Sequence, residues 1–128
     1  VLIKPGSALL CSKYNQKMII SLSGNPTAAL TTFELITKPV LEKLAGHPAV
    51  NIKREQAQLQ TDIKKVGPQR RFIRGQVNIN CEGQEVIVTQ QKSGNSILSS
   101  ALQSNCLIEI LPNERPLQKG QMVSIIKL

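Results

Sequence analysis

The second half of the chain is a series of short segments separated by turn residues, and this pattern limits its fold more than any other feature. Polar and apolar residues alternate over residues 56–63 and 71–81, while 86–88, 106–111 and 122–128 are short apolar runs. Alternation at every second residue is typical of a strand with one buried face. Short strands at this close spacing predict a small antiparallel barrel or sandwich.

Three details refine this prediction. Ile73, Val77, Ile79 and Cys81 should share one face of their strand, and Glu82-Gly83-Gln84 predicts a hairpin turn after it. Residues 97–102 fit one helical turn, and residues 112–120 fit a long connection between the last two strands.

The first half reads as strand, loop and helix. Residues 1–3 resemble the end of a buried strand, stopped by Lys4-Pro5-Gly6, and the apolar runs 8–11 and 17–20 predict a hairpin around residues 14–16. A helix should begin at Pro26 and end at Gly46. Its predicted apolar stripe is Ala29, Phe33, Ile36, Val40 and Leu44, and Pro39 should kink or divide it.

The predicted helix start is also a candidate ligand site. Gly24 lets a ligand approach the main chain, Asn25 is a good N-cap, and Pro26 suits the first helical position. Because a helix N-terminus attracts negative charge, this loop fits an anion site. A well-made cap without a ligand is the commoner meaning of such a sequence.

The charge is uneven. The net charge is +8, and residues 51–75 hold seven Lys or Arg against Glu55 and Asp62. Such a segment fits nucleic acid, an anionic ligand or a solvated face, and Lys64, Lys65 and Arg70 are interpreted as solvated turn charges. Nucleic acid is not expected, because three aromatic residues are too few for a base-stacking platform.

Other classes of protein are not supported. No apolar run approaches the roughly 18 residues of a membrane span. Three dispersed cysteines and one histidine, His47, indicate neither a disulfide framework nor a zinc site, so reduced thiols in the cytoplasm are expected. His47 should be a loop residue, and no nucleophilic catalytic pair is visible. Because the chain opens on an apolar run without Met, we expect the C-terminal piece of a longer polypeptide.

Several short motifs follow one another along the chain. They are Lys4-Pro5-Gly6, Ser23-Gly24-Asn25-Pro26, Thr32-Phe33-Glu34-Leu35, Lys38-Pro39, Leu44-Ala45-Gly46, Arg71-Phe72-Ile73-Arg74-Gly75, Gln91-Lys92-Ser93-Gly94, Leu98-Ser99-Ser100, Asn105-Cys106 and Gly120-Gln121-Met122-Val123. In order and spacing, they resemble the MoeA/gephyrin family of molybdopterin molybdenumtransferases over nearly the whole chain. The resemblance implies an α+β organisation. Residues 1–48 would be the C-terminal part of a three-layer α/β domain that binds molybdopterin, and residues 49–128 a small antiparallel β-barrel domain.

The resemblance also implies a function in molybdenum cofactor biosynthesis. The full-length protein would be a homodimer that inserts molybdate into adenylylated molybdopterin and releases AMP. Mg²⁺ would assist, held by acidic residues outside this chain, so the fragment alone is expected to be inactive. The alternatives are a non-catalytic interaction or scaffold module, since relatives such as gephyrin can act as scaffolds, or a small basic barrel that binds RNA.

By resemblance, the residues that would contact molybdopterin, phosphate or molybdate are Lys4, Gly24, Asn25, Pro26, Arg74, Ser93, Gly94 and Ser99. Ser23 departs from the family, which has a proline there. Lysine supplies a point charge for oxyanions, and arginine suits bidentate phosphate contacts. No metal ligand is expected. Because unpaired strand edges tend to pair with another chain, association through residues 1–22 is also predicted.

Overall fold

The structure is a computed structural model that describes residues 2–48, 51–89 and 101–128. The chain divides into two compact units, Val1–Ile52 and Lys53–Leu128. The domains expected at residues 1–48 and 49–128 stay a prediction.

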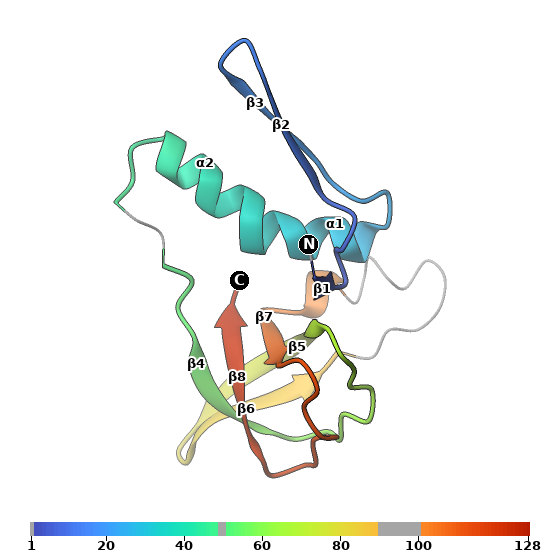
Figure 1. Ribbon diagram of the computed structural model, residues 1–128. Coiled ribbons are helices and arrows are strands. Elements are labelled where there is room, and N and C mark those ends of the chain that lie inside the picture. Colours follow the sequence, from blue (N-terminus) through green and yellow to red (C-terminus); the bar gives the residue numbers. More distant parts are fainter. Residues whose placement is uncertain (1, 49–50, 90–100) are drawn as a thin grey trace. The chain divides into compact units, whose positions relative to one another are not determined.

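The second unit is a small five-stranded β-barrel (Figure 1). Its strands are β4 (Glu55–Leu59), β5 (Arg70–Asn80), β6 (Gly83–Val88), β7 (Cys106–Ile110) and β8 (Met122–Lys127). They are hydrogen-bonded in the order β5-β6-β4-β8-β7, and β5 also pairs with β7, which closes the barrel. The barrel expected from the alternating segments is therefore confirmed.

One pairing departs from the antiparallel expectation. β4 runs parallel to β6, with Gln58 opposite Glu85 and Leu59 opposite Val86. The other pairs within the barrel are antiparallel. The chain reverses direction between β4 and β5 and again at the β5–β6 hairpin, so β4 and β6 run in the same direction.

The barrel encloses the main hydrophobic core. Side chains from all five strands and from the two long connections meet inside it, and β7 is buried along its whole length. The buried members are Ala57, Leu59, Ile63, Val77, Val86, Cys106, Ile108, Ile110, Leu117, Val123 and Ile125. Burial of this many aliphatic side chains is the main source of the unit's stability.

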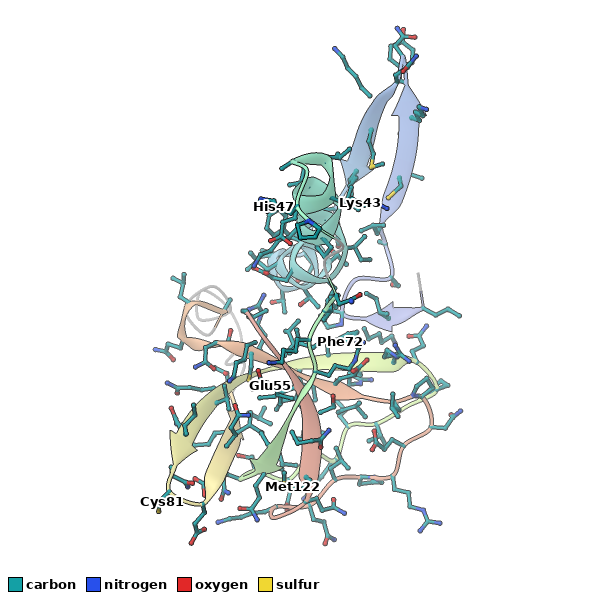
Figure 2. The ribbon with its side chains drawn as sticks, turned by 90° about the vertical axis from the view of Figure 1, so that its left-hand side faces the viewer. Lys43, His47, Glu55, Phe72, Cys81 and Met122 are labelled. Carbon is teal, nitrogen blue, oxygen red and sulfur yellow. The ribbon has the colours of Figure 1, made fainter. Side chains whose placement is uncertain are left out.

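The hairpin between β5 and β6 projects beyond this core. Its turn is Cys81-Glu82, with Asn80 opposite Gly83, so the predicted turn at residues 82–84 was placed slightly too late. Ile79 is 75% exposed and Cys81 is exposed, so the expected buried face ends at Val77. The cause is the length of β5, whose last residues pair only with β6; Cys81 lies at the hairpin tip (Figure 2).

The strand expected at residues 56–63 is shorter in the structure. β4 ends at Leu59, and Ile63 forms an isolated bridge with Leu117. The alternation still places Ala57, Leu59 and Ile63 in the core, so the pattern indicated burial correctly although the pairing stops. Of the helical turn expected at residues 97–102, residues 101–103 are helical and the first part lies outside the described residues.

The first unit has strands β1 (Ile3–Lys4), β2 (Leu10–Tyr14) and β3 (Lys17–Ser21). β2 and β3 form the predicted hairpin, and Asn15 and Gln16 turn it with φ of 44° and 64°. A two-residue turn with both φ angles positive matches the twist of an antiparallel pair. β1 confirms a strand end before Pro5, but Leu2 is 78% exposed, so the burial expected there is wrong.

The predicted helix is a continuous helical segment with three parts: α1 (Pro26–Thr32), a π-helical turn η1 (Phe33–Thr37) and α2 (Lys38–Leu44). In η1, the N–H of Lys38 donates to the carbonyl of Phe33, five residues earlier. This wider turn precedes Pro39, which has no N–H to donate, so the expected division is confirmed. After α2, Gly46 has φ +87° and His47 donates to the carbonyl of Glu42, as in a Schellman end.

The buried face of this helix is not the apolar stripe. The buried residues are Thr27, Ala28, Thr31, Thr32 and Thr37, whereas Phe33 and Leu44 are exposed. Small side chains on the buried face allow close approach of the chain, and Thr31 and Thr32 donate their hydroxyls to carbonyls of the preceding turn. Nowhere in the ranges described is a helix both long and apolar enough to cross a membrane.

Candidate functional site

Lys4 lies at a turn that is fixed against the helix. The Lys4–Pro5 peptide bond is cis, and Gly6 follows with φ +116°. A methyl group on Gly6 would collide with the side chain of Thr32 and lie 3.6 Å from the carbonyl oxygen of Ala28. Glycine is therefore required for the turn to pack on α1, and this packing positions Lys4, whose side chain is exposed.

Gly24, Asn25 and Pro26 are brought together at the start of α1. Asn25 is the N-cap, and its Oδ1 accepts the N–H groups of Thr27 (3.0 Å) and Ala28 (3.3 Å). The Oγ of Ser23 accepts the N–H of Asn25 at 3.2 Å. The cap expected from the sequence is confirmed, and it already occupies donors that an anion would otherwise use.

The Lys4-Pro5-Gly6 turn and the Gly24-Asn25-Pro26 loop differ in what they could offer an anion. Gly24 has no atom within 4 Å of where a Cβ would lie, so its surroundings are open. Residues 1–33 include three lysines and no acidic residue. Attraction of an anion here would rest on the charge of Lys4 and the helix dipole, more than on free backbone N–H groups.

Arg74 is a buried charge on β5, 6% exposed. Its Nη1 donates to the Oγ of Ser104 at 3.0 Å, and Ser104 donates in turn to the carbonyl of Ala101. The carbonyl of Arg74 accepts the N–H of Thr89 at 3.0 Å. One residue of β5 thus holds the chain at positions 89 and 104, while Ser93, Gly94 and Ser99 lie outside the described residues.

Asn105 continues this anchor, and sequence reasoning assigned no role to it. Its Oδ1 accepts the N–H of Val77 at 2.7 Å, and its Nδ2 donates to the carbonyl of Val77 at 3.0 Å. Its own N–H donates to Gly75, and its carbonyl accepts from Leu128. A side-chain amide that pairs with both backbone groups of one strand residue acts as an extra rung of the sheet. The signals in the sequence were an asparagine directly before the apolar run of β7 and its place in the Asn105-Cys106 motif.

A second buried charge lies on β7. Glu109 accepts from Arg54 at 2.6 and 3.2 Å and lies 3.4 Å from Arg70, beside a hollow of about 320 Å³ partly lined by Leu111 and Leu117. The hydrogen bond to Glu109 raises the pKa of Arg54. Arg70 is therefore an ion-pair partner, and its interpretation as a solvated turn charge is wrong. A glutamate within an apolar strand was the available signal, because a buried charge needs a partner.

The acidic and sulfur ligands needed for a metal do not gather in the described part of the chain. Residues 2–48, 51–89 and 101–128 contain no group of three or more His, Cys, Asp or Glu side chains that could hold an ion. A magnesium centre does not fit these residues, and no chemical step is assigned to one here.

A closed barrel with a buried arginine on one strand, preceded in the sequence by a capped helix and a Lys-Pro-Gly turn, defines an α+β protein chain that ends in a small β-barrel. The family described as "MoeA C-terminal region (domain IV)" matches residues 56–128. The chain belongs to the MoeA family.

Named relatives extend the similarity over nearly the whole chain. A molybdopterin molybdenumtransferase of Staphylococcus aureus strain COL is 30% identical over 126 residues, covering 98% of this chain and 30% of the relative. A protein of the same name from Staphylococcus epidermidis strain ATCC 12228 is 31% identical over 123 residues, covering 96% of this chain and 29% of the relative. The chain therefore spans about a third of the length of these relatives.

Solved structures agree. The crystal structure of a molybdopterin biosynthesis MoeA protein from Pyrococcus horikoshii OT3 is similar with a TM-score of 0.76 and 31% identity, covering 99% of this chain and 31% of that one. A molybdenum cofactor biosynthesis protein from Pyrococcus furiosus, 24% identical, shares the fold with a TM-score of 0.73, covering 99% of this chain and 43% of that one.

Proposed function

We propose that this chain is the C-terminal part of a molybdopterin molybdenumtransferase and acts in molybdenum cofactor biosynthesis. The observation that carries the proposal is the match of residues 56–128 to the MoeA C-terminal region. Relatives named for this activity match 98% of the chain, which supports the same assignment for residues before the barrel.

The complete reaction belongs to a longer protein. We propose that this parent inserts molybdate into adenylylated molybdopterin with release of AMP, as a cytoplasmic homodimer assisted by Mg²⁺. Residues 1–48 would be the last part of its molybdopterin-binding α/β domain. Because the chain spans 30% of the relatives' length, it should be inactive by itself.

In this proposal Lys4 binds the substrate directly. Its ammonium group would pair with phosphate or molybdate oxygens, and the Gly6 contact with α1 would hold it in place. Gly24, Asn25 and Pro26 would border the same substrate, with Asn25 keeping the helix start ordered. Stabilisation by a fixed positive charge is the chemistry that these residues can supply.

Arg74 supports a second part of the site. Its bond to Ser104 and the bond from Thr89 to its carbonyl fix both flanks of the segment that carries Ser93, Gly94 and Ser99. We propose that these three residues add neutral hydrogen bonds to the substrate. Arg74 itself is engaged in this support, so its contribution to binding would be partly indirect.

The test is Lys4→Ala in the full-length protein that contains this chain. We expect about a tenfold or greater loss of affinity for molybdopterin, because one charge-assisted contact is worth roughly 1.5–3 kcal/mol. Lys17→Ala is the matched control, since it removes an equal charge from the exposed β2–β3 hairpin. Isothermal titration and AMP release with molybdate report binding and turnover separately.

If Lys4→Ala leaves the affinity for molybdopterin unchanged, the role assigned to Lys4 is wrong. If the full-length protein neither binds molybdopterin nor releases AMP, the transferase proposal fails. The alternatives, a scaffold module or an RNA-binding barrel, would then become the leading explanations.

A further inference from the structure

The connection between β4 and β5 forms one wall of a shallow hollow on the barrel. The hollow has a volume of about 450 Å³ and is lined by Asp62, Ile63, Lys64, Lys65, Ile73 and Val88. Its floor is aliphatic, since Ile63 is 4% exposed and Ile73 and Val88 are half-buried against the core. Two hydrogen bonds between the backbones of Ile63 and Leu117, of 2.8 and 2.9 Å, fix this wall.

The rim of the hollow is positive and lacks neutralising partners. Lys64 and Lys65 are exposed and form no ion pair with any residue in the described ranges. By contrast, Lys127 and Arg70 are paired with Glu55 and Glu109. The carboxylate of Asp62 accepts the N–H of Lys119 at 2.8 Å, so it is engaged in fixing the neighbouring loop.

The sequence from this connection through β5 is rich in positive charge. Residues 63–81 contain no acidic residue and five Lys or Arg, of which Arg70 is paired with Glu109 and Arg74 is buried. The guanidinium of Arg71 lies beside Gly67, at 3.8 Å from the position of a Cβ there. Its Nε is buried and has no hydrogen-bond partner among the described residues. The charges of Lys64, Lys65 and Arg71 together attract an acidic partner.

The chemistry of the hollow favours an acidic protein segment over nucleic acid. Single strands bind through aromatic side chains that stack on bases, and the only aromatic residue of the barrel unit, Phe72, is 6% exposed. An aliphatic floor beside two lysines matches an aliphatic side chain flanked by carboxylates.

We propose that this hollow is a docking surface for an acidic segment of a partner protein, whose aliphatic side chain packs on Ile63, Ile73 and Val88. Carboxylates on either side of that residue pair with Lys64 and Lys65. No activity is required of the surface, so it is independent of the transferase proposal.

The probe is a synthetic peptide of Asp and Glu with one central Leu, titrated into the isotope-labelled full chain. We expect amide shifts at Asp62–Lys65, Ile73 and Val88, and affinity that falls about fivefold or more between about 50 and 300 mM salt because exposed charges are screened. Lys64→Ala with Lys65→Ala should weaken binding about fivefold or more. The matched control, Lys13→Ala with Lys17→Ala, removes the same charge from the β2–β3 hairpin and should change affinity less than about twofold.

Three further arms make the result decisive. A probe with Asn and Gln in place of the acids should not bind, and a probe with Ser in place of Leu should bind more weakly. Val88→Thr keeps the side-chain shape and should reduce affinity for the Leu probe only, with thermal unfolding as a check on folding. The proposal is overturned if the Ser probe binds as well as the Leu probe, if both lysine pairs matter equally, or if oligouridylate shifts the same amides at lower concentration.

Discussion

Among the described glycines of the barrel unit, Gly75 has the least room for a side chain. A methyl group at this position of β5 would lie 3.0 Å from the carbonyl oxygen of Ile87, 3.0 Å from Val86 and 3.1 Å from Ile108. These are backbone and core atoms with little freedom to move. The Arg-Gly pair of the sequence is therefore a packing requirement beside a buried charge.

Gly75→Ala should destabilise the chain by about 1–3 kcal/mol, because overpacking forces core atoms to shift. The midpoint of urea unfolding, followed by far-UV circular dichroism, measures this change. Gly67→Ala is the control in the same unit, since its methyl group would meet only Arg71, at 3.8 Å. Equal effects of the two substitutions would contradict the packing argument.

The three thiols should differ sharply in reactivity. Cys106 is fully buried, and burial raises the pKa of its thiol to about 11, whereas Cys11 and Cys81 are exposed. Since the thiolate is the reactive form, a disulfide reagent at neutral pH should modify Cys11 and Cys81 in the folded protein and Cys106 only after denaturation. Colorimetric titration with and without denaturant counts them. Rapid reaction of a Cys11→Ser, Cys81→Ser double variant would contradict the burial of Cys106.

At the scale of elements, the strands were predictable and the partners of polar residues were not. Alternation placed Ala57, Leu59 and Val77 in the core, because a strand with one face toward the core buries every second residue. The same reasoning failed for the helix, where Thr31 and Thr32 are buried and Phe33 is exposed, because burial there depends on which surface the helix meets.

The candidate site shows the same limit. The cap at Asn25 is local, within three residues, and the sequence predicted it. The bond from Arg74 to Ser104 joins residues 30 apart, and the bond from Arg54 to Glu109 joins residues 55 apart. Pairings of this kind depend on strand order, which periodicity does not encode.

The β2–β3 hairpin is the element most exposed to association. Leu10, Tyr14, Met18 and Ile19 are 47–68% exposed, and its two-stranded sheet has two open edges. We expect the isolated chain to self-associate reversibly, because exposed apolar side chains and unpaired edges favour pairing with another copy.

Sedimentation velocity over a range of concentrations measures this association. Met18→Lys with Ile19→Lys should shift the chain toward the monomer, because charge on an edge strand opposes pairing. Ile79→Lys, at the exposed end of the barrel hairpin, is the control and should have less effect. A monomer at all concentrations of the unaltered chain would contradict this prediction.

For the molecule as a whole, Glu55 sets part of its response to acid. It accepts from Lys127 at 2.7 Å and from Gln84 at 2.9 Å, and these bonds lower its pKa below the ordinary 4.5. A lowered pKa means that the carboxylate stabilises the folded state above about pH 4.5 and that this contribution is lost as the pH falls below it. Through its partners on β6 and β8, this one residue of β4 makes the stability of the barrel depend on pH in acid.

Glu55→Gln should therefore reduce the slope of the unfolding free energy with pH below about 4.5 and leave the slope at neutral pH unchanged. Urea unfolding at a series of pH values measures both slopes. Glu82→Gln is the control, because Glu82 lies in the exposed β5–β6 turn. An unaltered acid slope in Glu55→Gln would show that another carboxylate is responsible.

The two hydrogen bonds of Arg74, to Ser104 and from Thr89, also mean that the barrel should tolerate changes in the sequence between these two residues. The chain is held at Thr89 and at Ser104 by the same residue, and Asn105 then fixes the entry to β7. The positions of β6 and β7 therefore do not depend on the number of residues between Thr89 and Ser104. Because the entropy of closing a loop grows slowly with its length, by about 0.6 kcal/mol for each doubling, longer or foreign segments should be accepted there. A change of length between Thr89 and Ser104 should therefore leave the strand pairing of the barrel unchanged.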